Sequence, residues 1–121
     1  MVLTLETRKC EPGILVIELG GRITLGPERG QIQAAVVKAL NEGVKKLVFD
    51  LTKVAYIDSS GIGIIAYCFG KISQQGGSAV VVGAGGLVKE VFKLTRLDNV
   101  IPFFPDVDSA CVGLASAPPP A

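Results

Sequence analysis

An aspartate and two serines stand together in the middle of the chain, where the sequence reads Asp58-Ser59-Ser60-Gly61. Apolar residues then recur at helical spacing as far as Ile72, so these polar side chains fall at the start of a predicted helix. Asp58 or Ser59 can accept a hydrogen bond from an N–H of the first turn, which is the usual capping role of these residue types. The chemistry available here is therefore helix capping, or chemistry at a serine hydroxyl.

Phosphorylation is a modification that this position would tolerate. The free N–H groups and the positive end of the helix dipole both favour anions. A phosphate on Ser59 would add about −1.5 to −2 charges without unfolding the helix, and would change what can dock on it. Two alternatives stay open: Asp58-Ser59-Ser60 is only a capping segment, or Ser59 also carries a regulated charge.

The sequence argues against an enzyme. It contains no histidine, which removes the most common general base and the most common zinc ligand. A Ser-His-Asp triad therefore cannot form within one copy, and the G-x-S-x-G motif of serine hydrolases is absent. The loop Gly83-Ala84-Gly85-Gly86 lacks the G-x-G-x-x-G spacing of nucleotide-binding loops, so we expect a tight turn there. We predict no catalytic activity, no cofactor and no metal.

The composition is that of a single folded domain. Hydrophobic residues make up 49% of the 121 positions, enough for a core, and the net charge is only +1. A nucleic acid or a membrane surface is therefore not an expected partner. No apolar stretch approaches the roughly 20 residues of a spanning helix, and no signal peptide is visible, so a cytoplasmic location is expected.

The three cysteines, Cys10, Cys68 and Cys111, fit no disulfide framework and no metal site by their spacing. We expect reduced thiols, as is usual in cytosolic proteins.

Hydrophobic periodicity and turn residues predict the elements that position the serines. Two strands, 2–9 and 14–19, are joined by the turn signal Glu11-Pro12-Gly13, which predicts a hairpin. Helices and strands then alternate, in the order helix from Pro27 to Gly43, strand 46–51, apolar segment 54–57, helix 59–75, strand 79–82, helix 87–94, edge strand 100–104 and helix 107–114.

This alternation predicts an α/β fold, with a mixed, mostly parallel sheet of about four to five strands and helices packed against it. The domain is expected over residues 1–115, followed by a disordered proline-rich tail at 116–121. Phe103 and Phe104 beside an edge strand are compatible with a homodimer, and core packing explains them equally well.

The segment Asp58-Ser59-Ser60-Gly61-Ile62-Gly63 closely resembles the D-S-S-G-[LI]-G segment of STAS domains of the anti-sigma factor antagonist type. The resemblance extends over residues 3–115. Further segments that resemble the family are Gly20-Gly21-Arg22-Ile23 after the second strand, Val48-Phe49-Asp50-Leu51 before the motif, Gly76-Gly77 with Val80–Val82 after it, and Val91-Phe92 with Leu97 near the third helix.

This resemblance implies a single STAS-type domain that acts as a phosphorylation switch in transcription regulation. An anti-sigma factor with serine kinase activity would phosphorylate Ser59, and a serine phosphatase would reset the protein. The unphosphorylated form would bind that partner and release a sigma factor. The partner-binding residues implied are Asp58, Ser59, Ser60, Gly61, Gly21, Arg22 and Thr24.

One loop departs from the family pattern. Arg22 stands where an acidic residue is common, and Thr24 where an aspartate is common. Arg22 would then either change the choice of partner or contact a phosphate on Ser59 within the same chain. A second alternative for the whole protein is a STAS-type scaffold or ligand-sensing module in a pathway without sigma factors.

Overall fold

The computed structural model describes residues 3–11, 13–24 and 29–116. In chain order its elements are β1 (Thr4–Glu11), β2 (Ile14–Ile23), α1 (Arg29–Asn41), β3 (Lys46–Ile57), α2 (Ser59–Gln74), β4 (Ser78–Val82), α3 (Gly86–Leu94), the 3-10 helix η1 (Leu97–Asn99), β5 (Phe103–Phe104) and α4 (Val107–Ser116).

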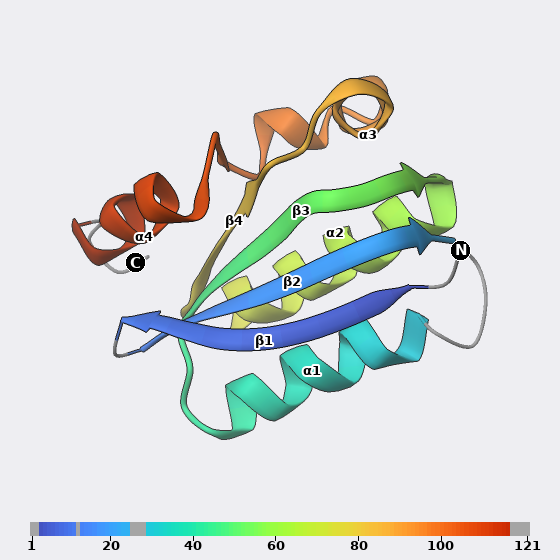
Figure 1. Ribbon diagram of the computed structural model, residues 1–121. Helices are drawn as coiled ribbons and strands as arrows, with labels where there is room; N and C mark the ends of the chain where they lie inside the picture. Colours follow the sequence, from blue (N-terminus) through green and yellow to red (C-terminus); the bar gives the residue numbers. More distant parts are fainter. Residues whose placement is uncertain (1–2, 12, 25–28, 117–121) are drawn as a thin grey trace.

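The described strands form one five-stranded sheet in the order β1-β2-β3-β4-β5 (Figure 1). The pair β1 and β2 is antiparallel, and the other three pairs are parallel. Parallel neighbours need crossover connections, which α1, α2 and α3 supply. The predicted hairpin and the predicted mixed, mostly parallel α/β fold are therefore confirmed.

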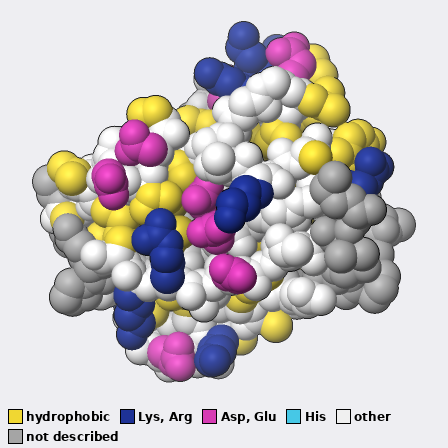
Figure 2. All heavy atoms as spheres, in the orientation of Figure 1, with side chains coloured by type: hydrophobic (Ala, Val, Ile, Leu, Met, Phe, Trp, Pro, Cys, Tyr) yellow, Lys and Arg dark blue, Asp and Glu magenta, His cyan; other side chains and the backbone are white. Residues whose placement is uncertain are grey.

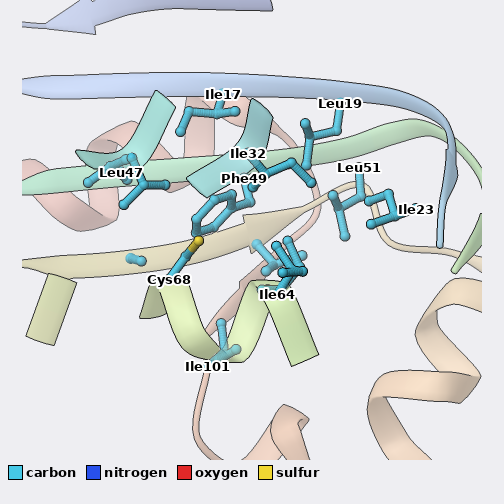
Figure 3. Packing of buried hydrophobic residues seen from close by; sticks show 14 of the residues in the cluster. Ile17, Leu19, Ile23, Ile32, Leu47, Phe49, Leu51, Ile64, Cys68 and Ile101 are labelled. Carbon is cyan, nitrogen blue, oxygen red and sulfur yellow. The ribbon is translucent and has the colours of Figure 1, made fainter. Parts of the chain in front are cut away.

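Three helices, α1, α2 and α3, pack on one face of the sheet, which we call the first face. On the central strands the residues that point to this face are apolar and meet the buried sides of the helices, and Figure 3 shows this packing around Phe49. On the edge strand β1, Thr7 and Lys9 also point to this face. This first core includes Ile17, Leu19, Leu47 and Phe49 from the strands, and Ile32, Ile65 and Phe92 from the helices.

The opposite, second face is divided into an apolar half and a polar half. The apolar half lies under α4, the one described helix on this side. This second core consists of the buried residues Ile14, Val16, Val48, Val80, Val82, Ala110, Cys111 and Leu114.

The polar half of the second face lies farther along the same strands, toward their carboxyl ends. Lys53 donates a hydrogen bond of 3.1 Å to Glu18, and Arg8 lies 4.0 Å from the same carboxylate. Figure 2 shows acidic and basic side chains side by side on this surface. Asp50 is buried nearby, and its carboxylate accepts hydrogen bonds from the backbone N–H and the hydroxyl of Thr52. A polar surface needs no covering helix, so α4 is required only over the apolar half.

The strand β3 is longer than its sequence pattern indicates. We expected a strand at 46–51 and a separate apolar segment at 54–57, but one strand, Lys46–Ile57, spans both. Its parallel pairing with β2 continues to Arg22 and Ile23 because two register shifts each accommodate one extra residue of β3. The extra length carries β3 directly to the start of α2.

The edge strand β5 is shorter than expected, with only Phe103 and Phe104 instead of 100–104. The N–H of Ile101 donates to the carbonyl of Leu97 at 2.8 Å, so this donor is used in a local turn. The ring of Phe103 packs edge-on against Phe92, with 5.2 Å between centroids. Phe104 packs on the second core. Core packing thus accounts for both rings, and the homodimer remains a prediction.

The helix start predicted at Pro27 falls outside the described residues, as does the disordered tail predicted at 116–121 except for its first residue. At that residue the prediction is wrong, because α4 continues through it. Ser116 is the last residue of α4. Within the described ranges, no helix has the length and apolar character needed to cross a bilayer.

The prediction that all three cysteines are reduced is wrong for two of them. Cys10 on β1 and Cys111 on α4 form a disulfide across a sequence separation of 101. Their spacing could not reveal this, because only the return of α4 over the second face brings them together. Cys68 is free and buried in the first core, and burial raises the pKa of its thiol to about 11.

Candidate functional site at the start of helix α2

Asp58, and not Ser59, is the N-cap of α2. Its backbone is extended, with φ −112° and ψ −173°, and its carboxylate accepts a hydrogen bond of 3.0 Å from the N–H of Gly61. Its carbonyl accepts the first helical bond, from Ile62, at 2.9 Å. The structure therefore assigns the capping role that the sequence left open between two residues.

Ser59 occupies the first helical position and is exposed, whereas Ser60 is half-buried. The hydroxyl of Ser59 makes no hydrogen bond to another described residue. Because Asp58 satisfies the first turn, capping does not account for Ser59. Its hydroxyl is accessible and lies where the helix dipole is positive.

Close packing explains Gly61. A Cβ placed there would collide with the carbonyl oxygen of Ile23 and lie 2.7 Å from Cγ1 of Ile57. The start of α2 therefore rests directly against the ends of β2 and β3. The N–H of Asp58 also donates to the carbonyl of Ile23, at 3.3 Å. Gly61 is buried and offers no surface to a partner. Its role is to let α2 pack closely against the strands and so to position Ser59.

Three residues form an exposed strip on α2, at positions i, i+4 and i+8: Ser59, Gly63 and Tyr67. This spacing places them on one side of a helix. Tyr67 is 53% exposed, and a Cβ at Gly63 would meet nothing within 4 Å. Tyr67 is not among the predicted site residues, although its spacing from Ser59 in the sequence places it on the same side of the helix. We call Ser59, Gly63 and Tyr67 the α2 strip.

The end of β2 lies beside the start of α2 and carries the other predicted residues. Gly21 is buried and has φ +82°, a conformation that favours glycine. Arg22 is exposed, and its guanidinium carbon lies 4.3 Å from the centroid of the Tyr56 ring. Thr24 is half-buried at the end of this segment. The structure thus brings Gly21, Arg22 and Thr24 to the same edge of the sheet as Ser59.

Arg22 is held on the side of the sheet away from α2. Its neighbour Ile23 and the paired Ile57 belong to the first core, and strand side chains alternate between faces. Arg22 and Tyr56 therefore lie over the second face. Contact between Arg22 and a phosphate on Ser59 would require the arginine to leave the Tyr56 ring.

Among the described residues, no group of three potential ligands could hold a metal ion. The glycine loop at 83–86 is a tight turn in which Gly83 and Gly86 have positive φ, and a side chain at Gly83 would collide with Thr52. A cavity of about 530 Å³ lies between β1 and α1 and is lined by Leu5, Thr7, Arg8, Lys9, Leu15, Ala35, Lys38, Ala39 and Glu42.

Comparison with known proteins gives one consistent result. The STAS domain family matches residues 7–110. A curated relative, the anti-sigma-B factor antagonist of Listeria monocytogenes, is 27% identical over 101 residues, which is 84% of this chain and 88% of the relative.

Two solved structures share the fold. An anti-sigma factor antagonist from Mycobacterium paratuberculosis superimposes with a TM-score of 0.81 at 23% identity, over 95% of this chain and 96% of that one. The Bacillus cell fate determinant SpoIIAA in its phosphorylated form gives a TM-score of 0.72 at 16% identity, over 90% and 96%. At these identities the likeness shows the fold alone.

Proposed function

The chain belongs to the STAS domain family, and we propose that it is an anti-sigma factor antagonist controlled by phosphorylation of Ser59. In the unphosphorylated state it binds an anti-sigma factor that is also a serine kinase, and a sigma factor is released. The kinase phosphorylates Ser59 and thereby ends the complex, and a serine phosphatase restores the protein. The proposal places the protein in the cytoplasm, where sigma factors act on RNA polymerase.

The observation that carries this proposal is the difference between the roles of Asp58 and Ser59 at the start of α2. Asp58 caps α2 by accepting a hydrogen bond from the N–H of Gly61, so the cap does not need the exposed hydroxyl of Ser59, which makes no hydrogen bond to another described residue. A kinase needs such a hydroxyl. The curated relative supports the class of partner, since it is named an anti-sigma-B factor antagonist. SpoIIAA, a protein of the same fold, exists in a phosphorylated form.

A phosphate on Ser59 would act through charge rather than through a change of fold. Within the first turn of α2 no residue is acidic, and the helix dipole favours an anion there, although the Asp58 carboxylate lies at the N-cap next to Ser59. The group would bring about −1.5 to −2 charges into a surface that a partner must desolvate. A kinase partner also holds nucleotide phosphates close to this serine, so the product would face an anionic site.

The contact surface follows from exposure and proximity. The α2 strip supplies a flat approach, because Gly63 allows a partner backbone close to the helix. Arg22, held by Tyr56, presents a positive charge at the neighbouring strand end. Asp58, Ser60 and Thr24 complete the rim, while Gly61 and Gly21 set the backbone path beneath it.

The test is an affinity purification from the native cell with three versions of the protein: wild type, Ser59→Asp and Ser73→Asp. Ser73 is an exposed serine at the other end of α2, so its substitution adds the same charge away from the site. We expect wild type and Ser73→Asp to capture an ATP-dependent serine kinase, and Ser59→Asp to lose it. Incubation of wild type with the captured kinase and ATP should place phosphate on Ser59.

A different result would change the function. If all three versions capture the same partners and Ser59 is never phosphorylated, the protein is a STAS-type scaffold or ligand-sensing module instead.

If wild type does capture the kinase, binding of the purified kinase to wild type before and after phosphorylation measures the switch directly. We expect the phosphate to weaken binding at least about tenfold, as burying an unpaired charge does.

A further inference from the structure

A disulfide joins the edge of the sheet to the C-terminal helix. Cys10 lies near the end of β1, next to a register shift in its pairing with β2. Cys111 lies in the middle of α4 and is 5% exposed, whereas Cys10 is half-buried. In Figure 1 the end of β1 and helix α4 both lie toward the left of the view. The bond therefore fixes α4 to a strand that is distant in sequence.

The other described contacts of α4 lie within the apolar half of the second face, where Val107 also packs on the second core and Gly113 closely approaches the ring of Phe104. Its buried side chains are Ala110 and Leu114 beside Cys111, and they meet only the apolar half of the second face. One further tie is a hydrogen bond of 2.6 Å from the Nζ of Lys46 to the carbonyl of Leu114. The first face, in contrast, is covered by three helices that share one core. The second core is thus the part of the domain in which a covalent link has the greatest effect.

We propose that Cys10 and Cys111 are a site of reversible thiol oxidation that latches α4 onto the second face. The oxidant class is a low-molecular-weight disulfide such as oxidised glutathione. This proposal rests on the cysteine pair and α4, and it is independent of the function proposed for Ser59.

The chemistry balances as two successive exchanges. One protein thiolate attacks a sulfur of the small disulfide and expels one small thiol, which leaves a mixed disulfide on the protein. The second protein thiolate then displaces the other small thiol and forms the Cys10–Cys111 bond. The protein loses two electrons and two protons, and the oxidant gains them as two thiols.

Exposure decides where reduction begins. An external thiolate can reach Sγ of the half-buried Cys10 more easily than that of Cys111, so Cys111 is the expected leaving group. The third cysteine does not compete. Cys68 lies inside the first core under α2, on the opposite face of the sheet, and burial keeps its thiol protonated. Oxidation should therefore give one product.

The experiment equilibrates the full chain in buffers of varied reduced-to-oxidised glutathione ratio, then traps thiols with an alkylating reagent and counts them by peptide mass spectrometry. We expect Cys10 and Cys111 to titrate together while Cys68 is unchanged. Amide hydrogen exchange over 107–116 should be at least about tenfold faster in the reduced state, and reoxidation should restore protection. Exchange in α1 and α2 should change little.

Variants separate the latch from general stability. Cys68→Ser should behave like wild type, and Cys10→Ser should show rapid exchange in α4 at every glutathione ratio. Cys10→Ser is the main variant because a hydroxyl is tolerated better at this half-buried site than at a buried one. Cys111→Ser is the second variant and removes the other sulfur of the bond. Three results would overturn the proposal: thiols that never oxidise, a disulfide that resists the most reducing buffer, or α4 exchange that is equal in both states.

Discussion

The two faces of the sheet differ in how they are held. The first face carries three helices around one continuous core, and the candidate phosphorylation site stands at its edge. The second face carries one described helix of ten residues, a small core and a disulfide. The difference teaches that the helix presenting Ser59 belongs to the stable part of the domain, whereas α4 is attached locally.

This comparison also explains why a phosphate at Ser59 would signal through charge. The buried side of α2 includes Ile65 and Ile72, both 0% exposed, so the helix is firmly anchored in the first core. Moving this helix would expose its buried side chains, and a surface charge at its first residue does not offset the free energy lost. We therefore expect the phosphorylated and unphosphorylated forms to share one fold.

The largest expected effect comes from truncating one buried side chain on each face. Ile65→Ala on α2 should lower the free energy of unfolding by about 2–5 kcal/mol, because the cavity opens in the core that holds the fold together. Leu114→Ala on α4 removes a similar side chain from the second core. It should lower global stability by less than about 1 kcal/mol while increasing hydrogen exchange in 107–116.

Urea unfolding followed by circular dichroism measures both values, with hydrogen exchange read on the same samples. The disulfide should be intact in both variants, so that α4 remains tethered in each case. Equal losses of global stability would show that α4 folds cooperatively with the rest, and the contrast between the faces would be wrong.

The next effect tests whether the start of α2 is fixed by close packing. Gly61→Ala should destabilise the protein by about 1–3 kcal/mol, because the new Cβ meets the carbonyl of Ile23 and the side chain of Ile57. Gly63→Ala is the matched control two residues later, where the space is open. It should be neutral or stabilising by up to about 1 kcal/mol, since alanine favours a helix over glycine.

Thermal unfolding of the two glycine variants gives the comparison directly. If Gly61→Ala matches Gly63→Ala in its melting temperature, α2 can shift away from β2 without cost. Ser59 would then not be held in a fixed position.

Much of this architecture could be predicted from local patterns. Turn residues and apolar periodicity located the hairpin and the alternation of helices and strands, because those signals lie within short windows. The motif around Ser59 located the candidate site for the same reason. The continuous β3 could not be predicted, because its pairing with the distant strand β2 continues past Lys53 only by accommodating extra β3 residues at two register shifts.

The contacts between distant elements were equally hidden. The Cys10–Cys111 bond depends on the path of α4, and the Arg22–Tyr56 contact depends on the register of β2 against β3. Burial of Gly61 also needed the structure, since a glycine after two serines is compatible with either an open contact surface or close packing.

A smaller effect separates capping from switching within the site. Asp58→Ala should cost about 0.5–2 kcal/mol of stability, because it leaves the N–H of Gly61 without its acceptor. Ser59→Ala should change stability by less than about 0.5 kcal/mol and abolish phosphorylation. Chemical unfolding and kinase assays on both variants give the four values. A loss of stability in Ser59→Ala as large as that in Asp58→Ala would make Ser59 a capping residue.

The smallest expected effect on stability concerns Arg22 over Tyr56. The contact is exposed and should contribute only about 0.5–1 kcal/mol, so Arg22→Gln should remain folded with a nearly unchanged free energy of unfolding.

The effect of changing Arg22 should appear in the interaction with the partner instead. Since Arg22 presents a positive charge over the second face, at the strand end next to the start of α2, Arg22→Glu should slow phosphorylation by a kinase that contacts this edge with acidic groups, and should lose less rate at high salt. Tyr56→Leu is the matched variant, because it frees Arg22 without changing its charge. If Tyr56→Leu slows phosphorylation as much as Arg22→Glu, the placement of the guanidinium matters. If it leaves the rate unchanged while Arg22→Glu lowers it, the charge alone guides the partner.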